Sequence, residues 1–178
     1  MSQSTTIYSI SKKLFEELKN SENRSKIKIY NTTKNYHTFQ NSFIGIEFVI
    51  KKNKTEQDKN VLNQIFNPTE FLGDFDFENS DIEEMLDFME SGNYFPYLCS
   101  EKLIEIDKIL TEITELDIRN NYNANELNEN EIYPNLWNNE SDKGESCNVN
   151  LLIEDFIKLK NIIKESRRTE NYLLICSG

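Results

Sequence analysis

The segment between residues 97 and 137 constrains the fold more than any other part of the chain, because its apolar residues recur with the period of an α-helix. Four of them follow one another at spacings of three and four: Leu103, Ile106, Leu110 and Ile113. That spacing places the four side chains on one face of a helix. Ser100 precedes the stripe and is expected to cap the helix, because a serine oxygen accepts a hydrogen bond from a free amide of the first turn.

Two further capping signals follow this helix and predict two shorter helices. Thr114 has Asp117 three positions after it, which is the arrangement of a capping box. Asn123 is a good N-cap for another turn. The segment therefore predicts a succession of three helices that meet at angles.

The remaining chain predicts both strands and helices. Strands are expected at residues 5–10, 43–50, 73–78 and 172–176. Helices are expected at residues 12–20, capped by Ser11, at residues 81–90, and at residues 150–168 with Leu152, Phe156, Leu159 and Ile163 along one face. Residues 31–42 and 51–60 are polar and are expected to be loops, whereas residues 26–30 fit either a strand or a short helix.

Residues 43–50, with the sequence FIGIEFVI, are the strongest candidate for a central strand. A nearly continuous apolar run is typical of a strand covered on both faces. Glu47 interrupts the run, and a carboxylate inside a buried strand needs a partner or a raised pKa. Glu47 is therefore expected either to reach water near the strand end or to face a pocket. Tyr133 and Trp137 are expected to pack on the helices or to line such a pocket.

Residues 73–78 alternate strictly between apolar and acidic side chains. As a strand they would place Asp74, Asp76 and Glu78 on one face. Such a face could bind a hard cation. The spacing does not match a calcium-binding loop, however, and alternation is typical of any half-buried strand. We therefore predict no metal site.

Residues 81–90 predict a short acidic helix that ends at Ser91-Gly92. Its apolar side chains are expected to face the core: Ile82, Met85, Leu86 and Met89. The acidic side chains would then lie on the solvent side of the helix.

The net charge of −11 is spread unevenly along the chain. Residues 1–60 carry 11 Lys or Arg and 6 Asp or Glu, a balance of +5, whereas residues 61–178 carry 9 and 25, a balance of −16. A field of this sign repels nucleic acid and anionic lipid and attracts basic proteins, although an acidic surface also serves solubility. The acids expected to contact a basic partner lie in two segments: Glu70, Asp74, Asp76, Glu78, Asp81, Glu83, Glu84 and Asp87, then Glu140, Asp142 and Glu145.

The cysteines and the apolar runs indicate a cellular compartment. Cys99, Cys147 and Cys176 are odd in number and far apart, which argues against a disulfide framework and for a reducing environment. The first residues lack the apolar core of a signal peptide. No apolar run approaches the length of a membrane span. We therefore expect a cytoplasmic location and no membrane partner.

The sequence contains no recognisable catalytic or cofactor-binding motif. His37 is the one histidine, so a zinc site of histidines or a histidine-dependent triad would have to use a residue expected in a surface loop. The five glycines are too few and too isolated for a phosphate-binding loop. We predict no catalytic residue and no cofactor. Carboxylate pairs for acid–base catalysis stay open, because 31 acidic residues make their presence uninformative.

At residues 131–134, Glu-Ile-Tyr-Pro, the sequence resembles the YfbM-like family, small bacterial proteins grouped as domain of unknown function 1877. The helix that ends at Ile109-Leu110, the turn at residues 113–116 and the final helix and strand also carry the resemblance. The resemblance makes residues 43–50 the central strand. It implies a single α/β or α+β domain over residues 1–178, with a mixed β-sheet flanked by helices.

Two positions depart from the pattern of that family. Its central strand usually carries His-Phe where this chain has Glu47-Phe48, and its Gly-Pro-x-Arg element corresponds to residues 92–97, which contain no arginine. If a histidine and an arginine served a shared pocket, this chain would lack both. The departures shift the expectation from an enzyme toward protein binding, since a fold does not fix a function.

Three functions therefore stay open. The first, which small size and acidic charge favour, is a non-enzymatic interaction module, specifically an immunity protein that neutralises a basic toxin in bacterial competition. The second is a small-molecule-binding protein or enzyme with a pocket near Glu47, Tyr133 and Trp137. The third is a structural protein without a separable activity.

Overall fold

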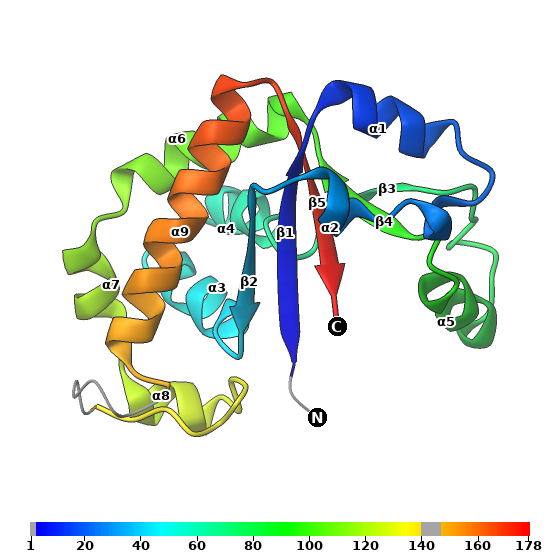
Figure 1. Ribbon diagram of the computed structural model, residues 1–178. Helices are drawn as coiled ribbons and strands as arrows, with labels where there is room; N and C mark the ends of the chain where they lie inside the picture. Colours follow the sequence, from blue (N-terminus) through cyan, green and yellow to red (C-terminus); the bar gives the residue numbers. More distant parts are fainter. Residues whose placement is uncertain (1–2, 140–146) are drawn as a thin grey trace.

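A five-stranded sheet organises the computed structural model, which describes residues 3–139 and 147–178 (Figure 1). The strands are β1 (Ser4–Ile10), β2 (Tyr36–Gln40), β3 (Glu70–Leu72), β4 (Phe95–Leu98) and β5 (Tyr172–Ser177). Their order is β2-β1-β5-β4-β3, so that β5 occupies the middle. The expected single domain with helices around a sheet is confirmed, and the pairings between the described strands are all antiparallel, where a mixed sheet was expected.

The helices pack on both faces of this sheet. They are α1 (Lys12–Lys19), the 3₁₀ turn η1 (Arg24–Lys26), α2 (Ile29–Thr32), α3 (Phe43–Lys51), α4 (Glu56–Asn63), α5 (Ile82–Glu90), α6 (Ser100–Glu112), α7 (Glu115–Asn121), α8 (Ala124–Glu129) and α9 (Val149–Arg168). In Figure 1, α3, α4, α6 and α9 lie on the left of the sheet, and α1 and α5 on the right. The segment at residues 26–30, which fits a strand or a helix, forms parts of η1 and α2.

The larger core lies between the sheet and α3, α6 and α9. Ile7 and Ile175 point into it from neighbouring strands. The predicted stripes of α6 and α9 are both fully buried: Leu103, Ile106 and Leu110 on α6, and Leu152, Phe156, Leu159 and Ile163 on α9. On the opposite face of the sheet, Ile10 and Leu174 pack against Phe15 and Leu18 of α1. Successive side chains of β1 and β5 therefore point alternately into the two cores, which lie on opposite faces of the sheet.

The predicted helix caps are confirmed with one shift. Ser11 accepts a hydrogen bond from Leu14 N, Thr114 and Asp117 form a capping box, and Asn123 caps α8. Ser100, however, is the first residue of α6, and the N-cap is Cys99, whose side chain makes no cap bond. The helix therefore begins one residue earlier than expected from Ser100 as the cap.

The predicted central strand at residues 43–50 is wrong, because this segment forms α3. A short apolar run without alternation fits a buried helix as well as a buried strand. Here the helix is fixed by its surroundings: Ile46, Val49 and Ile50 enter the core. A Cβ on Gly45 would lie 2.5 Å from the ring of Trp137, so glycine permits the close approach of the indole.

Three further expectations are corrected. The loop expected at residues 31–42 contains β2, whose Phe39 is fully buried beside β1. The loop expected at residues 51–60 contains most of α4, capped by Thr55. The strand expected at residues 73–78 is absent: irregular chain leads into a turn at residues 77–79, where Asp76 accepts hydrogen bonds from the amides of residues 78 and 79. These segments depend on distant partners or on local polar bonds that the apolar pattern does not show.

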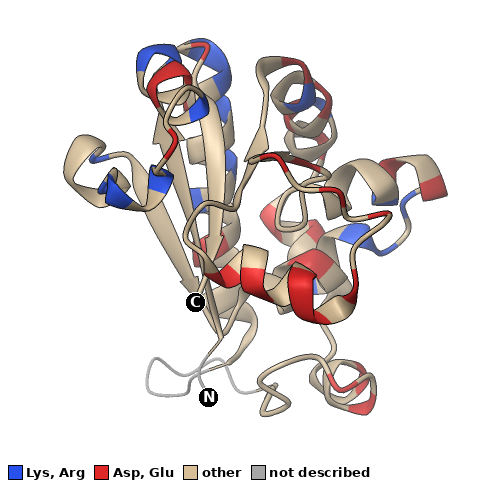
Figure 2. Ribbon diagram, turned by 90° about the vertical axis from the view of Figure 1, so that its right-hand side faces the viewer, with Lys and Arg blue, Asp and Glu red and all other residues tan. Residues whose placement is uncertain are grey.

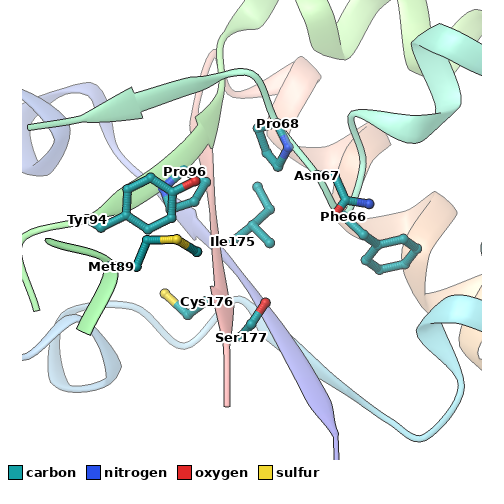
Figure 3. A pocket seen from close by; sticks show the side chains of 9 residues that line it. All are labelled: Phe66, Asn67, Pro68, Met89, Tyr94, Pro96, Ile175, Cys176 and Ser177. Carbon is teal, nitrogen blue, oxygen red and sulfur yellow. The ribbon is translucent and has the colours of Figure 1, made fainter. Parts of the chain in front are cut away.

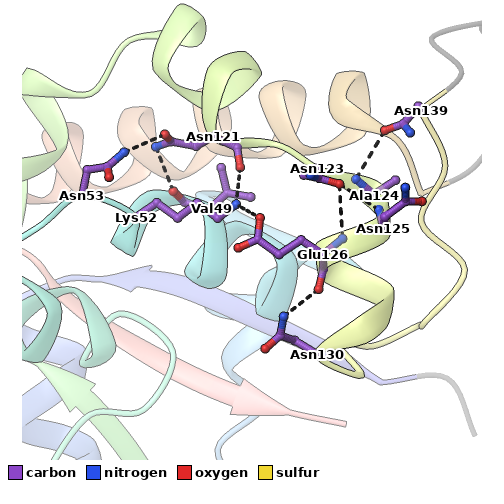
Figure 4. A network of polar contacts seen from close by, with 10 residues as sticks. All are labelled: Val49, Lys52, Asn53, Asn121, Asn123, Ala124, Asn125, Glu126, Asn130 and Asn139. Atoms are coloured by element: carbon purple, nitrogen blue, oxygen red, sulfur yellow. Dashed lines mark hydrogen bonds and ion pairs between the residues drawn. The ribbon is translucent and has the colours of Figure 1, made fainter.

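Asparagines connect the end of α3 with α7 and α8 (Figure 4). Lys52 Nζ donates to the carbonyl of Asn121 at 2.7 Å and also pairs with Glu126 of α8. Asn121 Nδ2 donates to Val49 O at 3.3 Å. Polar side chains thus donate hydrogen bonds to carbonyl groups at helix ends that have no partner within the helix. Among the described helices, none is long and apolar enough to cross a membrane.

Candidate protein-binding surface

The segment of residues 70–98, here called the α5 excursion, leaves the sheet at β3 and returns to it at β4. Figure 1 shows α5 standing apart from the helices that surround the larger core. Eight of the acids expected to contact a basic partner lie on this excursion and are exposed: Glu70, Asp74, Asp76, Glu78, Asp81, Glu83, Glu84 and Asp87. The other three, Glu140, Asp142 and Glu145, lie outside the described residues.

Aromatic rings hold the excursion together. The ring of Phe88 on α5 stacks on Phe75 with centroids 4.5 Å apart, and three more rings lie within 6.1 Å of it: Phe71, Phe77 and Tyr94. Gly73 has a φ of +132°, and a Cβ there would lie 2.5 Å from the Phe88 ring. The turn can therefore pass the ring only with glycine at this position.

Three of the four apolar side chains of α5 that were expected to face the core are exposed, and the fourth, Met85, is partly buried. Ile82, Leu86 and Met89 are 76, 53 and 47 % exposed, and no residue of α5 is buried. Phe88 occupies the inner face instead, because its ring fills the aromatic cluster of the excursion. The helix itself is confirmed and begins with a capping box between Asp81 and Glu84.

The acids of the excursion are not neutralised by neighbouring bases. Within the described part of the chain, no ion pair involves an acid between residues 70 and 90. Figure 2 shows acidic residues gathered on α5 and the turn before it, close to the C-terminal end of β5. A hydrogen bond from the Asn79 side chain lowers the pKa of Asp76, so that this carboxylate stays charged. The exposed apolar residues of α5 are therefore surrounded by negative charge.

A groove of about 320 Å³ opens beside the excursion (Figure 3). One side consists of Phe66, Asn67 and Pro68, and the other contains Met89, Tyr94 and Pro96. The last residues of β5 form the bottom of the groove: Ile175, Cys176 and Ser177. Met89 belongs both to the groove and to the exposed face of α5, so the two surfaces are continuous.

The lining of the groove is neutral at pH 7. None of its nine lining residues carries a formally charged side chain. Burial raises the pKa of the Cys176 thiol to about 11 and also raises the pKa of Tyr94. The groove therefore offers apolar and hydrogen-bonding surface, and the charge lies outside it on α5.

The three residues expected around a pocket do not gather at one place. Glu47 forms an ion pair with Lys51 one helical turn later, and its other oxygen accepts a bond from Asn67 at 3.4 Å. Trp137 is 4 % exposed, packs against α3 and donates to a backbone carbonyl. The hydroxyl of Tyr133 accepts a bond from the amide of residue 3. Glu47 does not line the groove itself. It is connected to the groove only through Asn67, which is a lining residue.

His37 lies on β2 and is not the surface-loop residue expected from the sequence. Its Nε2 atom lies 3.0 Å from Asp155 Oδ1, and Ser42 Oγ donates to Asp155 Oδ2 at 2.6 Å. Asp155 is 4 % exposed. Among the described residues no hydrogen bond joins Ser42 to His37, and a nucleophilic serine needs such a base. The three side chains of His37, Ser42 and Asp155 therefore connect β2 and the start of α3 to α9. No local sequence pattern predicted this contact.

These features define a small α+β protein whose antiparallel sheet carries an acidic excursion at one edge. Residues 1–176 match the family described as a domain of unknown function (DUF1877), and the chain belongs to this family. The expected family resemblance is thereby confirmed.

Among solved structures, the chain is similar to YfbM from Escherichia coli, a protein of unknown function, with 17 % sequence identity and a TM-score of 0.56. The match covers 98 % of each chain. At this identity the likeness shows a shared fold. No curated protein matches the chain.

Proposed function

We propose that this protein is a non-enzymatic interaction module that binds a basic protein through the α5 excursion. The observation that carries the proposal is the outward direction of Ile82, Leu86 and Met89 on a helix rich in unpaired acids. Monomeric proteins rarely expose a group of large apolar side chains on one element without an interaction to serve.

The two kinds of side chain would contribute in different ways. Apolar side chains that become buried in a complex supply most of the binding free energy, and a few of them dominate it. The surrounding carboxylates accelerate encounter with a positively charged partner and make the association rate sensitive to salt. Such a surface favours a partner with an apolar contact patch flanked by lysine or arginine.

A basic toxin of a bacterial competition system is the partner class that fits this surface best. Enzymes that act on nucleic acid carry positive surfaces, and an acidic protein that covers such a surface neutralises the enzyme. The net charge of −11 and the acids of the excursion support the assignment as an immunity protein. Cytoplasmic residence, also a proposal, would place it where an incoming toxin acts.

Co-expression with the product of the adjacent gene tests the proposal. We expect a complex that survives gel filtration and protects the cell from the toxin. Leu86→Ser on α5 is expected to weaken the complex at least tenfold, about 1.4 kcal/mol, because a buried apolar contact is lost. The matched control is Leu116→Ser on α7, because Leu116 is 64 % exposed and lies outside the excursion. No complex, or equal weakening by both variants, would contradict the proposal.

Small-molecule binding in the groove is a second candidate function. Its volume of about 320 Å³ lies within the range of ligand pockets. The bond from Asn67 to Glu47 gives one wall a polar residue whose orientation depends on the carboxylate. A ligand that raises the melting temperature of the wild type and not of Glu47→Gln would favour this candidate.

A further inference from the structure

We propose that the partner of this protein inserts an extended segment into the groove and adds it as a strand to the open edge of β5. This inference rests on the proposed function, because it specifies how a basic partner is held beside α5. It is carried by the register of the sheet, the shape of the groove and the distribution of charge.

Pro96 explains why the edge of β5 is open. The ladder between β4 and β5 contains two pairs, Leu98 with Leu173 and Tyr97 with Leu174. The next pair in register would join Pro96 to Ile175. Proline has no N–H and cannot donate to the carbonyl of Ile175, and such a residue typically marks the end of a ladder.

The register also shows where the backbone groups of β5 point. Ser4 N donates to Gly178 O at 2.9 Å, and Gly178 N donates to Ser4 O at 3.0 Å. Alternate residues of an antiparallel strand direct their N–H and C=O groups to opposite neighbours. Ile175 and Ser177 therefore direct theirs away from β1. On that side, the pair of Tyr97 with Leu174 implies that the N–H of Ile175 bonds to the carbonyl of Pro96. The carbonyl of Ile175 and both backbone groups of Ser177 have no strand partner in the described chain, and the tip of β5 extends past β4 in Figure 1.

The groove has the shape that an added strand requires. Its two sides flank the free edge of β5, and Figure 3 shows Ile175 and Ser177 directed to the side of Phe66, with Cys176 directed to the opposite side. Successive side chains of an added strand point to alternate faces of the sheet. Consecutive apolar residues of the segment would thus contact the Phe66 side and the Met89 side in turn. The open groups run from the carbonyl of Ile175 to Ser177, and about three residues of an added strand, roughly 10 Å, cover that stretch.

Charge identifies the chemistry of the occupant. The groove is uncharged, whereas α5, which contributes Met89 to it, carries five acids: Glu83, Glu84, Asp87, Glu90 and the cap Asp81. The segment that fits therefore has an apolar centre of about three residues with lysine or arginine at its ends. Backbone bonds supply affinity in strand addition, and side-chain pockets supply selectivity.

Three synthetic peptides test this mode of binding. The first has a valine-tyrosine-valine centre with two lysines on each side. The second replaces the lysines with glutamates, and the third keeps the lysines but carries N-methyl groups on the central amides that would face β5. We expect saturable binding of the first alone, with the largest amide NMR shift and the strongest exchange protection at Ser177. Binding of the N-methylated peptide with equal affinity, or no binding of the first peptide, would overturn the proposal.

A pair of protein variants tests the same bond from the other side. Ser177→Pro removes the N–H that faces the groove, and Ser177→Ala keeps it. We expect about tenfold weaker peptide binding for the proline variant and unchanged binding for the alanine variant, since one backbone hydrogen bond is lost. Unchanged urea midpoints would show that both variants fold, and the peptide series tests the proposal without either of them.

The outcomes separate this inference from the proposed function. If the first peptide or the toxin shifts the amides of α5 and leaves residues 175–177 unchanged, strand addition is wrong while the interaction module stands. If the peptide pairs with β5 but Leu86→Ser leaves the toxin complex unchanged, the use of the α5 surface is wrong. If the peptide-free protein self-associates and Ser177→Pro abolishes this, the occupant is a second copy of the chain, and the assignment to a basic partner is overturned.

Discussion

The helices α9 and α5 are both amphipathic in sequence, yet the structure uses them in opposite ways. Eight residues of α9 are buried against the sheet, α6 and α7, whereas α5 has no buried residue and exposes Ile82 and Leu86. The difference shows that a periodic apolar stripe identifies which side chains share a face. What covers that face depends on the elements that the rest of the chain brings to it.

The two regions also differ in what stabilises them. The larger core consists mainly of aliphatic side chains from segments far apart in sequence. The α5 excursion depends on rings that all lie between residues 71 and 94. Loss of a contact in the core should therefore lower global stability, and loss of a contact in the excursion should open that segment alone.

Phe156→Ala is expected to have the largest effect. Phe156 is 1 % exposed and lies in the middle of α9, so the substitution leaves a cavity that the sheet and α6 cannot fill. We expect a loss of about 3–5 kcal/mol in the free energy of unfolding. Urea denaturation followed by circular dichroism measures it. A loss below about 1 kcal/mol would show that the core repacks. It would also mean that substitutions in the core and in the α5 excursion do not differ in their effect on global stability.

Phe88→Ala makes the same change in the excursion and is expected to have a smaller, local effect. The Phe88 ring is only partly buried, and each aromatic pair it loses is worth about 0.5–1.5 kcal/mol beyond area burial. We expect amide exchange to accelerate in residues 70–98 and to stay unchanged in α9, with a smaller shift of the urea midpoint than for Phe156→Ala. Uniform acceleration throughout the protein would mean that the excursion and the core unfold together.

Much of the fold could be predicted from the sequence wherever the signal is local. The capping box at Thr114 and the stripe of α9 depend on residues a few positions apart, and both are confirmed. The helix at residues 43–50 could not be predicted, because its conformation is decided by contact with Trp137 and the core, about 90 residues further along the chain. β2 was missed because its pairing with β1 is likewise non-local.

The candidate surface likewise has a part that could be predicted from local sequence and a part that depends on distant contacts. Its acids could be found because they lie close together in sequence, between residues 70 and 87. The groove could not, because it combines residues 66–68, 89–96 and 175–177. Pro96 was visible in the sequence, but its effect depends on its register with Ile175, which only the assembled sheet defines.

Asp81→Ala is expected to have the smallest effect on stability. It tests most directly whether α5 unfolds independently of the core. Asp81 accepts a hydrogen bond from Glu84 N at 2.9 Å and completes the capping box of α5. Loss of such a cap costs about 1 kcal/mol of helix stability, but α5 contributes no buried residue to the core. We therefore expect faster exchange in the first turn of α5 and an unchanged urea midpoint. Asp81→Asn keeps an N-cap acceptor and should exchange at nearly the wild-type rate. If Asp81→Ala lowers the midpoint as well, α5 belongs to the cooperative core, and the exposure of Ile82 and Leu86 does not make it an independent unit.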